Sequence, residues 1–98
     1  MKEHEKESDS ILGVLREYKS KIYGKKIVIT GTLSKPRRMV AADIHHKGGL
    51  LQGAVTAQTD FLVVGERFGN TKISAAFKFG TYTITEKEFM EMLREDAD

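Results

Sequence analysis

Apolar residues along this chain occur in short uninterrupted runs that predict buried β-strands. The run Lys26-Ile-Val-Ile-Thr30 is rich in β-branched residues and stops at Gly31, so it predicts a strand followed by a tight turn. Phe61-Leu-Val-Val64 is apolar at every position, which is typical of a strand covered on both faces in a parallel sheet. Two weaker segments are predicted as further strands: Leu50, Leu51, Ala54 and Val55, bent at Gly53, and Tyr82 to Ile84.

Between and after these strands, apolar residues recur at helical spacing. Met39, Val40 and Ile44 predict a helix capped by Ser34, with Pro36 in its first turn and Gly48-Gly49 beyond its end. A second helix is predicted with Asn70 or Thr71 as cap, Ile73, Ala76 and Phe77 facing inward, and Gly80 as a left-handed end. A third begins with the capping box of Thr85 and Glu88 and buries Phe89, Met92 and Leu93.

The N-terminal part of the chain has a different pattern. Residues 1–8 are polar and are expected to form a disordered tail, whereas residues 9–21 predict an amphipathic helix. Residues 22–94 then form one domain, followed by an acidic tail at 95–98. The order of elements predicts an α/β fold, in which a four-stranded parallel sheet with right-handed crossovers is flanked by helices on both faces, with the N-terminal helix as an addition.

Length and composition limit what the protein can be. A chain of 98 residues has room for one hydrophobic core, and 40% hydrophobic and 31% charged residues are ordinary for a globular domain. With no cysteine, the chain has no disulfide, no zinc–thiolate site and no thiol nucleophile. Because no apolar run approaches the ~18 residues of a membrane span and no signal peptide begins the chain, we expect no membrane contact. The lack of cysteine favours an intracellular protein, cytoplasmic and associated with the nucleoid if it is bacterial or phage-like, and nuclear if it is eukaryotic.

The charges are sorted along the chain, although the net charge is only +2. Residues 1–22 hold five Lys or Arg and five Asp or Glu, residues 23–80 hold nine and three, and residues 81–98 hold two and six. A basic middle segment favours an anionic partner such as nucleic acid or a phosphorylated protein, because Lys and Arg release counterions on binding. The alternative is an ordinary solvated surface.

Several motifs occur together in a specific order. They are Gly24-Lys-Lys-Ile-Val-Ile-Thr-Gly-Thr-Leu33, Pro36-Arg37, Gly48-Gly49, Thr59-Asp60-Phe-Leu-Val-Val-Gly65, and Gly69-Asn-Thr-Lys72 through Gly80. Over residues 22–94 the chain resembles the BRCT family, above all the BRCT domain at the end of bacterial NAD-dependent DNA ligases. It is also similar to the BRCT domain of the replication factor C large subunit, which has an additional preceding helix and recognises 5′-phosphorylated duplex DNA.

The chain departs from the family pattern in two ways. It has no Trp, which many BRCT domains carry in the last helix, and Phe89 is expected to take that place. Family members that read phosphopeptides usually work as tandem pairs, whereas this chain has room for one repeat. The resemblance therefore implies a single BRCT fold that favours DNA over a phosphopeptide.

Thr30 and Gly31 lie where ligands usually bind, at the carboxyl end of a strand in an open parallel sheet. A hydroxyl and a closely approaching backbone N–H are suited to phosphate oxygens, and the family uses this pair in the same way. Lys72, near the start of a helix, matches the family's phosphate-contacting lysine. The alternatives are that Thr30 is a strand former, Gly31 only makes the turn, and Lys72 is a solvated cation, although a helix N-terminus slightly disfavours one.

Further cations extend this predicted corner. Arg37, whose guanidinium suits bidentate phosphate contacts, aligns with a DNA-contacting arginine of the replication factor C relative. Arg38, Lys35 and Thr32 lie beside it in sequence and are candidates for contacts to the DNA backbone.

Other chemistry is not supported by the sequence. His45, His46 and Asp43 predict a solvated helix face rather than a metal site, because adjacent helical residues point about 100° apart. No nucleophile elbow, P-loop, dinucleotide fingerprint or nucleotidyl-transfer lysine motif occurs. We therefore predict no enzyme activity, cofactor, metal or small-molecule substrate for this chain, although it resembles part of a ligase.

Three hypotheses remain at this point. The first is a replication or repair module that binds a 5′-phosphorylated or nicked DNA duplex through Thr30, Gly31, Lys72 and the neighbouring cations. The second is an adaptor that binds a phosphoprotein at the same corner or a replication protein through the acidic last helix. The third is a structural module whose phosphate corner is vestigial.

Overall fold

The computed structural model of the chain describes residues 20–95. Residues 1–19 and 96–98, which include the predicted N-terminal tail, most of the predicted helix 9–21 and most of the acidic tail, lie outside the described residues. Ser20 and Lys21, at the end of that predicted helix, are not helical, and Lys21 begins a turn. The elements are β1 (Lys26–Thr30), α2 (Arg37–His46), β2 (Leu50–Gln52), β3 (Phe61–Val64), α3 (Asn70–Phe79), β4 (Tyr82–Thr85) and α4 (Glu86–Glu95).

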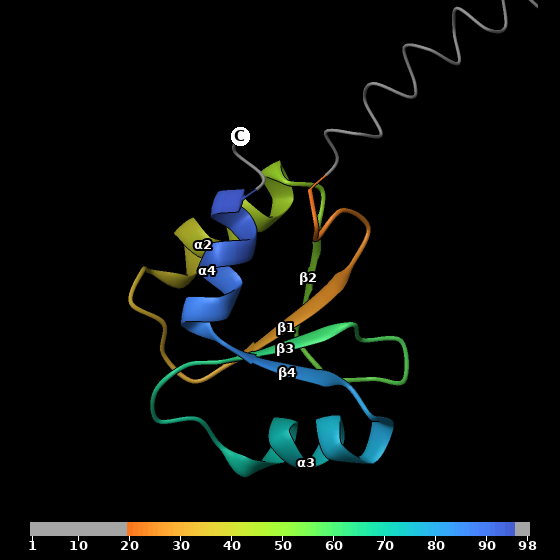
Figure 1. Cartoon of the computed structure of the whole chain (residues 1–98). Helices are drawn as coiled ribbons and strands as arrows, with labels where there is room; N and C mark the ends of the chain where they lie inside the picture. The colour runs from red at the N-terminus through yellow and green to blue at the C-terminus, as the bar shows by residue number, and fades with distance from the viewer. Residues whose placement is uncertain (1–19, 96–98) are drawn as a thin grey trace, which may run out of the picture.

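The strands form a four-stranded parallel sheet in the order β2-β1-β3-β4, which confirms the predicted fold class. The two most apolar strands, β1 and β3, occupy the centre, and the two weaker ones lie at the edges. Figure 1 shows α2 and α4 on one face of the sheet and α3 on the other. Since every strand runs in the same direction, the loops that lead into the three helices all leave the same edge of the sheet.

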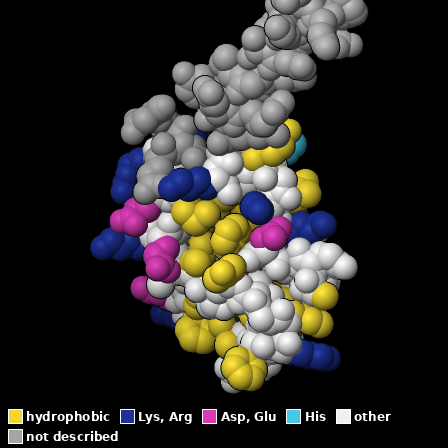
Figure 2. Space-filling view, turned by 45° about the vertical axis from the view of Figure 1, so that its right-hand side comes forward, with side chains coloured by type: hydrophobic (Ala, Val, Ile, Leu, Met, Phe, Trp, Pro, Cys, Tyr) yellow, Lys and Arg dark blue, Asp and Glu magenta, His cyan; other side chains and the backbone are white. Residues whose placement is uncertain are grey.

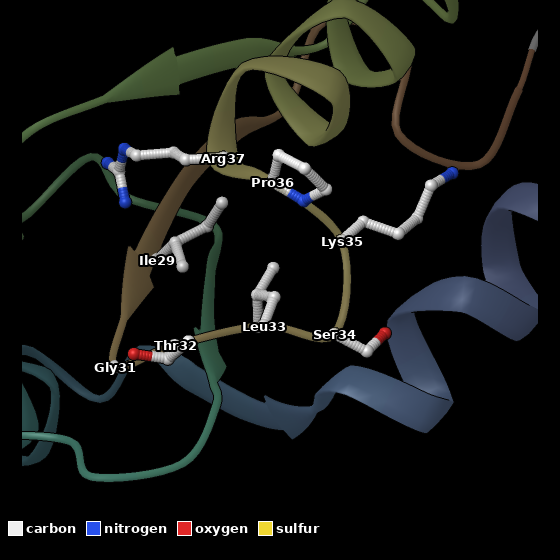
Figure 3. A pocket seen from close by; sticks show the side chains of 8 residues that line it. All are labelled: Ile29, Gly31, Thr32, Leu33, Ser34, Lys35, Pro36 and Arg37. Atoms are coloured by element: carbon white, nitrogen blue, oxygen red, sulfur yellow. The ribbon is translucent and has the colours of Figure 1, made fainter.

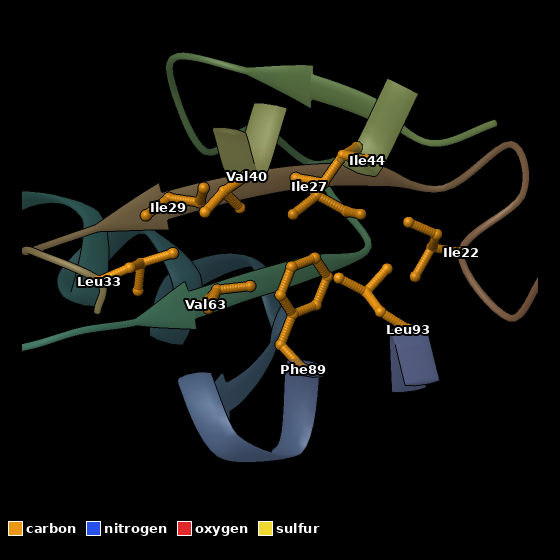
Figure 4. Close-up of a cluster of buried hydrophobic side chains, with 9 residues drawn as sticks. All are labelled: Ile22, Ile27, Ile29, Leu33, Val40, Ile44, Val63, Phe89 and Leu93. Carbon is orange, nitrogen blue, oxygen red and sulfur yellow. The ribbon is translucent and has the colours of Figure 1, made fainter. Parts of the chain in front are cut away.

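Successive side chains of each strand point to opposite faces of the sheet, so the core is divided into two parts. Ile27 and Ile29 of β1 point toward α2 and α4, where they pack with Val40, Ile44 and Phe89. Figure 4 shows this larger cluster, in which Phe89 projects from α4 onto the sheet. Phe89 is fully buried, as expected of a residue in the place of the family's tryptophan. The smaller cluster, on the α3 side, contains Val28, Leu62 and Ala76.

Two predicted helix ends are confirmed. The backbone N–H of Thr85 donates to the Glu88 carboxylate at 2.8 Å, and the N–H of Glu88 donates to the Thr85 hydroxyl at 3.1 Å, which is the reciprocal bonding of a capping box. Gly80 ends α3 with a left-handed φ of 70°.

The predicted caps of α2 and α3 are wrong. α2 follows Pro36, and Ser34 instead donates its N–H and its hydroxyl to the Glu86 carboxylate. α3 follows Gly69, so Asn70 and Thr71 are the first residues of the helix itself, and no side-chain cap bond is made.

Four apolar residues lie elsewhere than predicted. Phe77 is 90% exposed, because α3 contacts the sheet through Ala76 and Ile73 and leaves the next position outside that contact. Met39 is exposed, whereas its neighbour Val40 is buried. β2 ends at Gln52, so Ala54 and Val55 are not part of the strand. Among the described residues, no helix is long and apolar enough to cross a membrane.

Candidate functional site

The turn after β1 is held against the loop after β3. Thr32 donates its N–H to the Glu66 carbonyl at 2.7 Å, and Glu66 donates its N–H to the Thr32 carbonyl at 2.9 Å. Gly31 has a left-handed φ of 85°, and a Cβ there would lie 2.6 Å from the Glu66 carbonyl oxygen. The fold therefore requires glycine at position 31, because the close approach of the two loops leaves no room for a side chain.

Thr30 and Lys72 lie on the same side of the sheet. Thr30 is two residues after Val28, so its side chain is on the α3 face by strand alternation, and it is 5% exposed. Lys72 belongs to the first turn of α3 and is half-buried. The fold thus places the predicted hydroxyl and the predicted lysine on one face of the sheet.

A cavity of about 340 Å³ opens beside this turn. Its lining includes Ile29, whose side chain is on the α2 face, so the cavity lies on the opposite side of the turn from Thr30 and Lys72, neither of which lines it. Figure 3 shows the loop from Gly31 to Pro36 curving around the cavity, with the side chains of Arg37 and Lys35 extending in opposite directions. The lining residues are Ile29, Gly31, Thr32, Leu33, Ser34, Lys35, Pro36 and Arg37.

The candidate residues in this loop differ in which of their polar groups are available to contact a ligand. The Lys35 ammonium lies 2.9 Å from the Asp43 carboxylate, so part of its charge is neutralised within the chain. The N–H of Thr32 is donated to Glu66, which leaves the exposed hydroxyl as its free group. Arg37 and Arg38 are exposed at the start of α2.

The helix beginnings at this edge carry unlike charges. Neither α2 nor α3 has an acidic residue in its first turn or a side-chain cap bond, and both carry cations in the first turn, Arg37 and Arg38 in α2 and Lys72 in α3. By contrast, α4 begins with Glu86 and Glu88. Because a helix N-terminus carries partial positive charge, cations there are unfavourable and acidic residues favourable. Two of the three helices therefore combine positive side chains with positive helix ends, which together attract anions.

One cation was missed by the sequence interpretation. Arg67 lies in the loop between β3 and α3, is exposed, and has a left-handed φ of 58° although it is not glycine. Such a conformation costs about 1–3 kcal/mol, so the surrounding loop must hold it. The only sequence signal for Arg67 was its place in the basic middle segment.

Glu86 fixes the loop that lines the cavity. Its carboxylate accepts the Ser34 N–H at 2.8 Å and the Ser34 hydroxyl, which joins the start of α4 to the middle of the β1–α2 loop. These two residues are 52 positions apart in the sequence. Among residues 20–95 there is no group of three or more His, Asp or Glu that could hold a metal ion.

Comparison with known proteins agrees with this architecture. Residues 17–93 match the family model described as the BRCA1 C Terminus (BRCT) domain. The chain is 46% identical over 76 residues to a DNA ligase of Aquifex aeolicus (strain VF5), covering 76% of this chain and 11% of the ligase. It is 45% identical over 71 residues to a DNA ligase of Helicobacter acinonychis (strain Sheeba), covering 72% and 11%, and 41% identical over 80 residues to one of Helicobacter pylori (strain Shi470), covering 82% and 12%. The chain thus spans about a tenth of the length of these relatives.

Proposed function

The chain belongs to the BRCT family, and we propose that it is a non-catalytic module of DNA replication or repair that binds a 5′-phosphorylated or nicked DNA duplex. The observation that carries the proposal is the pair of uncapped helix N-termini led by Arg37, Arg38 and Lys72 at one edge of the sheet. Such an arrangement is unfavourable in isolation and becomes favourable when a phosphate is bound. The similarity to DNA ligases supports DNA as the source of that phosphate.

The residues take different roles in this proposal. The terminal phosphate binds at the corner of Thr30, Gly31 and Lys72, where a hydroxyl, a backbone N–H and an ammonium supply the donors. The adjoining phosphates along the DNA backbone contact Arg37, Arg38 and the Thr32 hydroxyl, and the exposed Arg67 adds a further cation. Lys35 contributes less, because its ammonium is shared with Asp43.

The proposed module recognises DNA and leaves chemistry to other protein segments. The residues at the edge provide hydrogen-bond donors and positive charge for a phosphate. In a bacterial cell the module acts in the cytoplasm, where the DNA is.

The test is a titration of labelled duplexes that differ only in the presence of a 5′-phosphate, with the full chain and its Lys72→Ala variant. We expect the wild type to prefer the phosphorylated duplex and Lys72→Ala to lose that preference. Lys78→Ala is the matched control, because Lys78 belongs to the last turn of the same helix, where its ammonium lies over the Phe79 ring. Equal affinity of the wild type for both duplexes would refute terminal-phosphate recognition.

A competitor separates the two phosphate sources. If a phosphoserine peptide displaces the DNA while its unphosphorylated form does not, and binds more tightly than the DNA, the module is a phosphoprotein adaptor instead. If neither peptide competes, DNA is the ligand.

A further inference from the structure

Apolar side chains in register across the sheet become progressively more exposed toward β4. Ile27, Phe61 and Tyr82 are paired across β1, β3 and β4, and they lie on the face that carries α2 and α4. Ile27 is fully buried, Phe61 is partly buried, and Tyr82 is 74% exposed. The rings of Phe61 and Tyr82 are 6.3 Å apart between centroids and tilted by 34°, so they form one contiguous surface.

This surface continues onto the neighbouring elements. Ile84 of β4 and Met92 of α4 are also partly buried and pack against the same core cluster. We call the set of Phe61, Tyr82, Ile84 and Met92 the apolar ledge. It extends the main core to the solvent at the β4 edge, whereas the aromatic residues of α3 lie on the opposite face of the sheet.

No helix among residues 20–95 covers the outer end of the apolar ledge, at Tyr82. Among residues 20–95, only α2 and α4 lie on this face, and α4 packs on β3 and β4 while Tyr82, the first residue of β4, stays 74% exposed. An apolar sheet face of this kind is normally buried against another layer of secondary structure, such as a helix. A helix placed beside α4 would bury Tyr82 and complete the layer.

The charges along α4 indicate which kind of helix would bind there. With about 100° between successive residues, Glu88 lies on the same flank as Met92, whereas Lys87 and Arg94 lie on the flank toward α2. Arg94 lines a separate groove with Asp43 and Lys47 of the α2 region, which confirms that placement. Figure 2 shows hydrophobic side chains gathered on one face of the domain, bordered by side chains of both charges.

We infer that the apolar ledge binds an amphipathic helix of another protein, with apolar residues against Phe61, Tyr82, Ile84 and Met92 and a basic residue facing Glu88 of α4. The apolar contacts supply the affinity, because a large aromatic side chain that changes from exposed to buried is the usual anchor of an interface. The Glu88 carboxylate selects a basic partner over an acidic one. This surface is separate from the phosphate corner, so a partner helix and DNA can be bound together.

The test uses the full chain labelled at Ile and Met methyl groups and two synthetic helical peptides with identical leucine positions. One peptide carries lysines on its polar face and the other carries glutamates. We expect the lysine peptide to shift the Ile84 and Met92 methyl signals and to bind at least about tenfold more tightly than the glutamate peptide.

Variants identify the surface. Tyr82→Ser should weaken the lysine peptide about tenfold or more. Phe77→Ser, which removes a more exposed ring from the opposite face, should change the affinity less than about twofold. Glu88→Gln should weaken binding a few-fold and reduce its salt dependence, and Gln at position 88 still accepts the capping hydrogen bond from Thr85. Lys72→Ala should leave peptide binding unchanged, which separates this result from the DNA test.

Three outcomes would overturn the inference. They are equal affinity for the two peptides, methyl shifts that Tyr82→Ser does not reduce, and concentration-dependent shifts of the ledge signals without peptide. The last result would mean that a second copy of this chain covers the ledge.

Discussion

The backbone nitrogen of Thr32 lies 2.7 Å from the carbonyl oxygen of Glu66, and this contact joins the loops that follow the two central strands. The loops lead into α2 and α3, so the contact helps to fix the first turns of these two helices, which carry Arg37, Arg38 and Lys72, relative to each other. Gly31 lies immediately before the contact, where a Cβ would lie 2.6 Å from the same carbonyl oxygen.

Gly31→Ala should therefore destabilise the domain by about 2 kcal/mol or more, because alanine must adopt a left-handed φ and displace the Glu66 backbone. The measurement is urea unfolding followed by circular dichroism. The control is Gly53→Ala, since Gly53 has open space around its Cβ position and should change stability by no more than about 0.5 kcal/mol. If both variants unfold at the same urea concentration, the proposed crossing of the loops is wrong.

Arg37→Ala and Arg38→Ala should each weaken binding to any DNA duplex and reduce the salt dependence of binding by about one phosphate contact. Neither should remove the preference for a 5′-phosphate, which is assigned to Lys72. The measurement is duplex affinity over a series of salt concentrations. Lys87→Ala is the control, because Lys87 is exposed on the acidic helix α4 and should leave the salt dependence unchanged.

Lys35→Ala should affect DNA binding less than Arg37→Ala, because its ammonium lies 2.9 Å from the Asp43 carboxylate. Asp43→Asn should strengthen DNA binding a few-fold, since removal of the carboxylate frees the Lys35 charge. The same duplex titration at low salt measures both variants. Weaker DNA binding by Asp43→Asn, in a variant with unchanged unfolding, would mean that the ion pair positions Lys35 for the ligand.

Phe89→Ala should destabilise the domain by about 3–5 kcal/mol, because the Phe89 side chain is fully buried between α4 and the sheet. Phe77→Ala should change stability by no more than about 0.5 kcal/mol, because its ring is 90% exposed. The sequence pattern assigns both residues to the core, so thermal unfolding of the pair tests the structure directly. A similar loss in both variants would place Phe77 in the core after all.

Thr85→Ala should cost about 1 kcal/mol by removing the hydroxyl that accepts the Glu88 N–H. Thr85→Ser retains such a hydroxyl and should lose much less. Chemical unfolding of both variants compares them, and an equal loss would assign the effect to the strand position of Thr85 rather than to the cap.

The pattern of the sequence determined most of the fold. Apolar runs at Lys26–Thr30 and Phe61–Val64 identified the central strands, and the capping box at Thr85 and Glu88 identified the start of α4. These features were predictable because strand propensity, helical spacing and capping depend on residues within a few positions of each other. The candidate corner was also found from sequence, through motifs shared with a family, and its binding role is still a prediction.

Only the tertiary structure decided which residues are held by distant partners. Ser34 binds Glu86 instead of capping α2, Lys35 pairs with Asp43, and Thr32 gives its N–H to Glu66. The exposure of Phe77 and Tyr82 likewise depends on how far α3 and α4 extend over the sheet. Spacing along a chain specifies the face on which a side chain lies, but what covers that face depends on the packing of segments that are far apart in the sequence.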